Sequence, residues 1–226
     1  MDKVGLLRGV PLFAGLPDRE LEALASSLGK RTFGKGMIIF HGGSLGRTLY
    51  IIESGLVRIF SLSESGQELT VNLYGPGEIF GEMALLDGRP RSAGALCMER
   101  TVAHTLRRDA FDRCLERTPA LARGVFDLLI ARLRYTTSHL ESLAFLDVYG
   151  RVAGKLLELG ERYGCQGDGL KIDLRLTQSE LATWLAASRE SENKVLSSFR
   201  DEGLIAVNGQ EITILDCRGL EDRVVY

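Results

Sequence analysis

The sequence predicts an α+β fold in three consecutive parts, and three observations predict it. Short β-favouring runs separated by glycine turns fill the region from about residue 31 to residue 106. Further along, a stretch without glycine or proline after Gly124 carries apolar residues at heptad spacing. Two short helical patterns then precede two apolar runs joined by Asn-Gly. We therefore expect a first domain over residues 1–118, a long helix and hinge over 119–146, and a second domain over 147–226.

Length and composition are those of an ordinary soluble protein, with 226 residues, 45% hydrophobic and 26% charged. The net charge is −2, and residues 147–226 hold 10 Lys+Arg against 14 Asp+Glu, a net charge of −4. Any contact with nucleic acid must therefore come from a local arrangement of side chains. No apolar run approaches the roughly 18–20 residues of a membrane span, and the first residues do not form a signal peptide, so we expect a cytoplasmic protein.

Cysteine and histidine residues show no metal-binding pattern. Four cysteines lie far apart without a C-x-x-C pair, and the three histidines form neither H-x-H nor H-E-x-x-H. We expect reduced packing thiols and no metal site.

The first domain opens with short helices between Leu6 and Leu28, followed by strands. The β-favouring runs are residues 37–40, 48–52, 56–60, 69–74 and 101–106. Many short strands with glycine turns predict a sandwich or barrel.

One long helix follows, from residue 119 to about residue 145. Its stripe consists of Phe126, Leu129, Leu133, Thr136, Leu140 and Leu143, at spacings of 3, 4, 3, 4 and 3. Such spacing is typical of a two-stranded coiled coil, which predicts a homodimer. Packing of this helix on its own domain is the alternative. A polar Thr136 within the stripe favours the dimer, because its hydroxyl needs a partner such as a symmetry mate or a ligand.

The last part begins at Asp147, a plausible N-cap that marks the hinge. A half-buried strand is expected over residues 170–176, and Thr177 to Glu180 form a capping box. The helix opened there leads through Ala186-Ala187 to a second helix, which Ser188 caps and Gly203 ends. Asn208-Gly209 between two apolar runs then predicts a hairpin. A helix-turn-helix followed by a hairpin is a winged helix.

Polar side chains at the start of the second of these helices suit the reading of DNA bases. An arginine can donate to guanine, a carboxylate can accept from cytosine, and a lysine can reach guanine or phosphate. The candidate DNA-binding residues are Thr177, Gln178, Ser188, Arg189, Glu190, Asn193 and Lys194. The alternative is a solvated charged face on a winged helix that binds protein.

Residues 80–93 form the chemical centre of the first domain. Gly81 offers close backbone approach and Glu82 can accept from a sugar hydroxyl. Arg91 supplies a planar fork for a phosphodiester, and Ser92 supplies a hydroxyl. These residues can hold a sugar phosphate, or Arg91 and Glu82 can form an ion pair that closes a loop.

Three segments resemble the family of the cyclic-AMP receptor protein and the fumarate and nitrate reduction regulator (CRP/FNR). They are GEMALLDGRPRSA, LAFLDVYGRVAGKLLEL and LTQSELATWLAASRESENKVL, and the resemblance follows the cyclic-AMP receptor branch. It implies an N-terminal cyclic-nucleotide-binding β-roll, a double-stranded β-helix similar to a jelly roll. It also implies a long dimerisation helix and a C-terminal winged helix-turn-helix that binds DNA.

The resemblance further implies an allosteric transcription regulator, not an enzyme, with cAMP as effector. Gly81, Arg91 and Ser92 would hold the cyclic phosphate, Glu82 the ribose, and Thr136 and Thr137 the adenine. The homodimer would bind a pseudo-palindromic operator and work with RNA polymerase.

Lys194 departs from the arginine of the best-known member, which puts the base read there in doubt. No cysteine cluster for an iron–sulfur centre lies in the first thirty residues, and no supported haem ligand is present. A regulator without a ligand, and a nucleotide-gated protein-interaction module, stay open.

Overall fold

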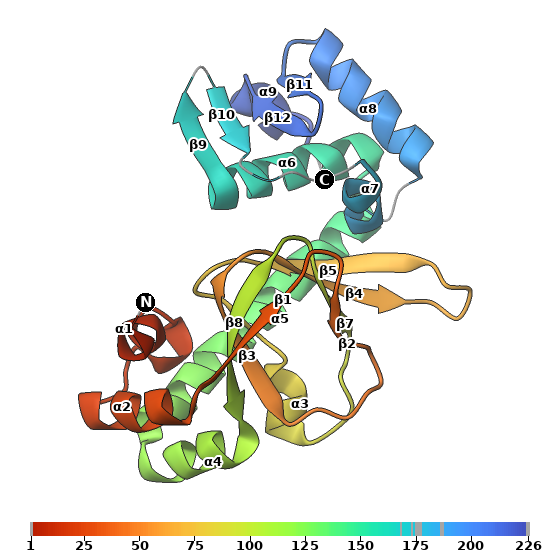
Figure 1. Cartoon of the computed structure of the whole chain (residues 1–226). Coiled ribbons are helices and arrows are strands. Elements are labelled where there is room, and N and C mark those ends of the chain that lie inside the picture. Colours follow the sequence, from red (N-terminus) through yellow and green to blue (C-terminus); the bar gives the residue numbers. More distant parts are fainter. Residues whose placement is uncertain (1, 168, 173, 175–177, 186–187, 225–226) are drawn as a thin grey trace. The chain divides into compact units, whose positions relative to one another are not determined.

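The chain folds into two compact units, Met1–Leu133 and Arg134–Tyr226, which are described separately here from a computed structural model. Residues 2–167, 169–172, 174, 178–185 and 188–224 are described. The long helix α5 (Pro119–Phe145) contributes residues to both units (Figure 1). Within the described residues, no helix is long and apolar enough to cross a membrane.

The first unit contains two four-stranded antiparallel sheets. One sheet has the order β1-β8-β3-β6 and the other the order β2-β7-β4-β5. Their strands are β1 (Gly29–Phe33), β2 (Ile38–Phe40), β3 (Thr48–Ser54), β4 (Val57–Leu62), β5 (Glu68–Tyr74), β6 (Ile79–Phe80), β7 (Gly94–Cys97) and β8 (Thr101–Arg107). The predicted β-rich first part is thereby confirmed, with three strands that the sequence pattern did not predict, β1, β6 and β7.

Alternation along β3 explains how this unit is layered. Tyr50 and Ile52 point into a core between the two sheets, which also receives Val57 of β4. Leu49 and Ile51 belong instead to a second core on the other face of the same sheet. Because successive side chains of a strand point to opposite faces, both faces of β3 are buried.

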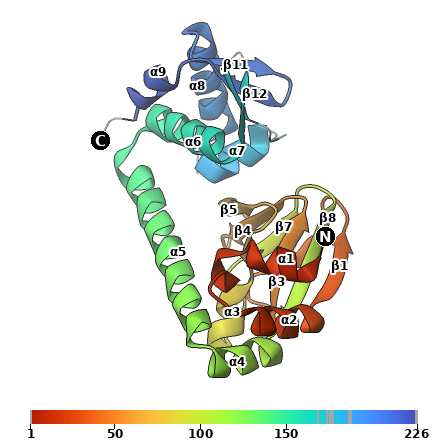
Figure 2. The same ribbon diagram turned by 90° about the vertical axis from the view of Figure 1, so that its left-hand side faces the viewer.

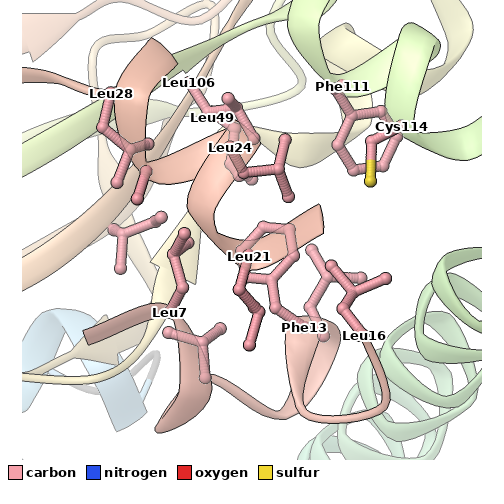
Figure 3. Packing of buried hydrophobic residues seen from close by; sticks show 14 of the residues in the cluster. Leu7, Phe13, Leu16, Leu21, Leu24, Leu28, Leu49, Leu106, Phe111 and Cys114 are labelled. Atoms are coloured by element: carbon pink, nitrogen blue, oxygen red, sulfur yellow. The ribbon is translucent and has the colours of Figure 1, made fainter. Parts of the chain in front are cut away.

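Helices cover the outer face of the β1-β8-β3-β6 sheet. They are α1 (Lys3–Arg8), the short 3₁₀ helix η1 (Pro11–Phe13), α2 (Asp18–Ser27), α4 (Arg108–Arg117) and the start of α5. Figure 3 shows the packing of Leu7, Phe13, Leu21, Leu24 and Leu28 beside Leu49 and Leu106 of the sheet. The short helices predicted between Leu6 and Leu28 are therefore confirmed.

The second unit combines helices with one small antiparallel sheet of the order β11-β12-β10-β9. Its elements are α6 (Val148–Tyr163), β9 (Gly164–Gly167), β10 (Gly169–Ile172), α7 (Gln178–Leu185), α8 (Arg189–Asp201), β11 (Ile205–Asn208), β12 (Glu211–Ile214) and α9 (Cys217–Glu221) (Figure 1 and Figure 2). Helices α7 and α8 followed by the β11–β12 hairpin confirm the predicted winged helix-turn-helix.

Local signals that set these boundaries are visible in the caps and the turn. Asp147 accepts a hydrogen bond from the Gly150 amide at 2.8 Å, and Ser188 accepts one from the Ser191 amide at 3.1 Å. The hairpin is shifted by one residue from the prediction, because Asn208 pairs with Glu211 and the two-residue turn is Gly209-Gln210. Gly209 has a φ of 63°, a value that glycine adopts without strain. The expected capping box at Thr177 lies outside the described residues.

Candidate functional site

Two short elements place the predicted phosphate-binding residues around one point of the first unit. Strand β6 (Ile79–Phe80) ends at Phe80, and the short helix α3 (Glu82–Asp87) begins two residues later. Gly81 makes the turn between them with a φ of 79°. A Cβ at this position would lie 2.6 Å from the Nη1 atom of Arg91, so only glycine lets the two approach.

Arg91 points into the unit and is 6% exposed. Its Nη1 donates to the Gly81 carbonyl at 2.6 Å, and its Nη2 donates to the Thr48 carbonyl at 2.8 Å. The Nε atom is buried and has no hydrogen-bond partner within the described structure. Burial lowers the pKa of Arg91, while electrostatic interactions with Tyr50 and Glu82 oppose that change. The guanidinium nevertheless stays charged at neutral pH, because an arginine side chain does not lose its proton in proteins.

Glu82 lies beside this arginine and is 7% exposed. Burial raises the pKa of the Glu82 carboxyl, and its own backbone amide and Arg91 partly counteract the rise. A second guanidinium, that of Arg132 on α5, approaches the Glu82 Oε1 atom with its Nε at 3.6 Å. Arg132 also donates to the Ile79 carbonyl at 2.8 Å and lies 4.1 Å from the Tyr74 ring centroid.

Arg132 is a site residue that the sequence analysis missed. A usable signal was present, because Arg132 lies four residues before Thr136 and therefore on the same face of the helix. With it, the site holds two buried or half-buried guanidinium groups and one buried carboxyl. The surplus positive charge suits a ligand with one negative charge.

The other predicted ligand residues occupy more open positions. Ser92 is exposed, and its Oγ lies 3.4 Å from the Met83 Sδ atom. Thr136 and Thr137 are exposed on the part of α5 that belongs to the second unit. The structure therefore brings Gly81, Glu82 and Arg91 together, and the parts assigned to Thr136 and Thr137 remain predictions.

The predicted dimer stripe leaves much apolar surface on α5 uncovered. Side chains of Phe126, Leu129, Leu133 and Leu140 are exposed by 64%, 40%, 67% and 65%, while Leu143 is half-buried. Ile130, which the heptad pattern did not include, is also half exposed. Large apolar patches of this kind are typical of protein interfaces.

Helix α8 has the two faces expected of a recognition helix. Val195, Leu196 and Phe199 are buried, whereas Glu190, Asn193 and Lys194 are exposed. Glu190 and Lys194 form an exposed ion pair of 3.2 Å. Such pairs are worth only about 0.3–0.5 kcal/mol, so a DNA base can replace either partner at little cost.

Other predicted DNA-binding residues are placed only through their backbones. Arg189 is the first residue of α8 and Gln178 the first of α7, and nothing is described of their side chains. Thr177 lies outside the described residues. One acidic residue of α8 was not foreseen as buried: Glu192 is 0% exposed and lines a cavity with Leu181, Leu196 and Gln210.

Comparison with known proteins identifies both halves of the chain. A family model described as cyclic nucleotide-binding domain matches residues 30–118, and one described as Crp-like helix-turn-helix domain matches residues 150–223. The CRP-like cAMP-activated global transcriptional regulator of Mycobacterium tuberculosis is 35% identical over 99% of both chains. The cyclic AMP receptor protein of Thermus thermophilus is 37% identical over 96% of this chain and 97% of that protein.

Solved structures agree with this result. FixK2 from Bradyrhizobium japonicum superimposes with a TM-score of 0.81 at 20% identity, over 88% of this chain and 98% of that one, which shows the shared fold. The catabolite activator protein of Thermus thermophilus is 35% identical with a TM-score of 0.55, over 95% of this chain and 98% of that one.

Proposed function

The chain belongs to the CRP family of cyclic-nucleotide-binding, DNA-binding transcription regulators, and we propose that it acts as a homodimer whose effector is cAMP. Members of this family are transcription regulators rather than enzymes. The names of the mycobacterial and Thermus relatives, both of which refer to cAMP, support the choice of effector.

The observation that carries the effector proposal is the surplus positive charge at the buried site. Arg91 and Arg132 face one carboxyl, that of Glu82, whose pKa burial raises. A cyclic phosphodiester carries one negative charge and would supply acceptor oxygens to the Arg91 guanidinium. We assign the cyclic phosphate to Arg91, Ser92 and the Gly81 amide, and the ribose hydroxyl to Glu82.

Thr136 and Thr137 complete the proposed ligand site by contacting the adenine, one of them from the partner subunit. Exposure of both threonines beside the apolar stripe of α5 supports this assignment. A symmetric pairing of two α5 helices would bury the stripe of Phe126, Leu129, Leu133, Leu140 and Leu143.

DNA would be read by the exposed face of α8. We assign base contacts to Arg189, Glu190 and Lys194, with Thr177, Gln178, Ser188 and Asn193 as supporting contacts. Two α8 helices of a dimer would read half-sites about 34 Å apart in a pseudo-palindromic operator. A regulator of this kind would then act on RNA polymerase in the cytoplasm.

Ligand binding would control DNA binding through the hinge at Asp147. Contacts between the ligand and α5 favour one arrangement of the helix end over another. Coupling of this kind is typically worth about 1–3 kcal/mol, which changes DNA affinity by about 5- to 150-fold.

A calorimetric panel of cAMP, cGMP and cyclic dinucleotides tests the effector. We expect saturable heat with cAMP, and a large loss of affinity in Arg91→Ala while the dimer persists. Arg89→Ala is the matched control, because Arg89 is an exposed arginine two residues away. If another nucleotide binds and cAMP does not, that nucleotide is the effector. If no nucleotide of the panel gives heat, the protein is a regulator without a ligand.

Footprinting on promoter DNA tests the second half of the proposal. Arg189→Ala is expected to lower discrimination against wrong bases by about 1–3 kcal/mol per half-site without changing ligand affinity. Arg200→Ala, an exposed arginine near the other end of α8, is the control. Equal loss of specific and non-specific binding would make Arg189 a phosphate contact, and no footprint would favour a protein-interaction module.

A further inference from the structure

Arg91 is held by more than its two hydrogen bonds, because an aromatic ring and a glycine backbone pack against its guanidinium. The Arg91 Cζ atom lies 4.2 Å from the centroid of the Phe40 ring. At Gly46, a Cβ atom would lie 2.1 Å from the Arg91 Nε and 2.4 Å from its Cζ. No side chain therefore fits at Gly46 while the guanidinium keeps this position.

The loop that contains Gly46 is also tied to the main chain of Arg91. The Gly43 amide donates to the Arg91 carbonyl at 2.8 Å, and the Arg91 amide donates to the Ser44 carbonyl at 2.8 Å. Ser44 in turn donates from its hydroxyl to the His41 carbonyl at 2.6 Å. The same loop thus fixes both the backbone and the side chain of Arg91.

Phe40 is itself fixed within a cluster of three rings. Its centroid lies 5.8 Å from that of Tyr50 and 5.9 Å from that of Phe80. Tyr50 and Phe80 stack on each other at 4.9 Å with an interplanar angle of 10°. Phe80 immediately precedes Gly81, so the ring cluster joins the support of Arg91 to the turn that accepts its hydrogen bond.

This arrangement is specific for a guanidinium group. The flat face of an arginine stacks on an aromatic ring, and the attraction grows when water is excluded. Holding a long side chain in place before the ligand arrives removes part of the conformational entropy lost on binding. A lysine at residue 91 would keep the charge and lose both the stacking and the two-pronged geometry.

From these contacts we infer that Phe40 and Gly46 are positioning residues, which hold the Arg91 guanidinium ready for the phosphate of the ligand. The inference rests on the proposed binding of a cyclic nucleotide at Arg91. It assigns to the glycine-rich loop of residues 41–46 a role in ligand affinity, although the loop itself need not touch the ligand.

Calorimetry with cAMP on four proteins tests the affinity effect: the wild type, Phe40→Leu, Phe40→Tyr and Phe111→Leu. We expect Phe40→Leu to weaken binding by about 5- to 30-fold, and Phe40→Tyr to restore most of the affinity, because it keeps the ring. Phe111→Leu is the control, since Phe111 is more deeply buried than Phe40 and lies in the separate core beneath the helices. Wild-type affinity in Phe40→Leu would overturn the inference.

Nitrogen-15 spectra of the same proteins without ligand report on the position of Arg91 directly. The Nε–H signal of Arg91, assigned by its loss in Arg91→Lys, is expected to be shifted upfield by the Phe40 ring. That shift should disappear in Phe40→Leu and persist in Phe111→Leu. An unchanged signal in Phe40→Leu would overturn the inference that Phe40 positions Arg91. If the wild type binds no nucleotide, the proposed function fails, while this spectrum still decides whether Phe40 positions Arg91.

Discussion

Replacing Leu133 by glutamine tests whether the apolar stripe of α5 joins two chains. Leu133 is 67% exposed, so about two-thirds of its side chain remains available for burial in a dimer. Full burial of a leucine side chain contributes about 1.5–3 kcal/mol, which leaves about 1–2 kcal/mol for this fraction. A symmetric dimer contains the residue twice, so the loss is about 2–4 kcal/mol, or about 30- to 1,000-fold in the dissociation constant.

Sedimentation equilibrium measures this constant directly over a range of protein concentrations. Ala131→Gln is the matched control, because Ala131 is exposed two positions earlier and therefore projects from another side of the helix. Glutamine and leucine have similar helix propensities, so α5 itself is preserved. A wild type that remains monomeric, or a Leu133→Gln dimer as tight as the wild type, would refute the reasoning.

Three further predictions concern the ligand site, acid stability and the hinge. Arg132→Gln should weaken cAMP binding in calorimetry by about tenfold or more, because charged hydrogen bonds contribute about 1.5–3 kcal/mol, and unchanged affinity would remove Arg132 from the site. Burial and the charge of Lys155 lower the pKa of His139 below its ordinary 6.5. Thermal stability should therefore fall as the pH drops from 6.5 toward the lower pKa that His139 has in the folded chain. Only the unfolded chain takes up the proton there; His139→Gln should show a smaller fall between pH 7.5 and 5, and an equal fall would contradict the assignment. Asp147→Ala should lower the free energy of unfolding, measured by chemical denaturation, by about 1 kcal/mol, and Asp147→Ser should lower it much less. An unchanged free energy of unfolding in Asp147→Ala would show that the Asp147 cap does not stabilise the helix.

The sequence predicted the strands that are rich in apolar residues and missed those that contain few. The runs at 48–52, 69–74 and 101–106 lie within strands β3, β5 and β8, and the run at 56–60 lies within β4 except for Leu56. β1 was missed because four of its five residues are exposed and its sequence, GKRTF, contains only one large apolar side chain. Its place at the edge of the sheet is set by pairing with β8, a contact that no local pattern encodes.

The site divides in the same way between local and distant residues. Gly81, Glu82 and Arg91 are close in sequence, so their spacing and chemistry predicted a common site that the structure brings together. Arg132 comes from a helix far along the chain, and its only sequence signal is its position four residues before Thr136 on the same helix face. Glu192 of α8, to which the sequence analysis assigned no position, is fully buried.

Helix α5 carries one side-chain contact of each unit within less than one turn. Arg132 contacts Glu82 and the Ile79 carbonyl within the first unit. Three residues later, the Tyr135 hydroxyl lies 3.4 Å from the Lys155 Nζ atom of α6, within the second unit. Three residues of an α-helix span about 4.5 Å, so Arg132 and Tyr135 lie within one turn of the same helix.

Lys155 extends this connection to the DNA-binding helices. It is 7% exposed, pairs with Glu158, and lies 4.2 Å from the ring of Trp184, a fully buried residue of α7. Because leaving a buried cation without its partners costs free energy, separating Lys155 from Tyr135, Glu158 or Trp184 is unfavourable. Lys155 therefore connects α5, α6 and α7 within the second unit.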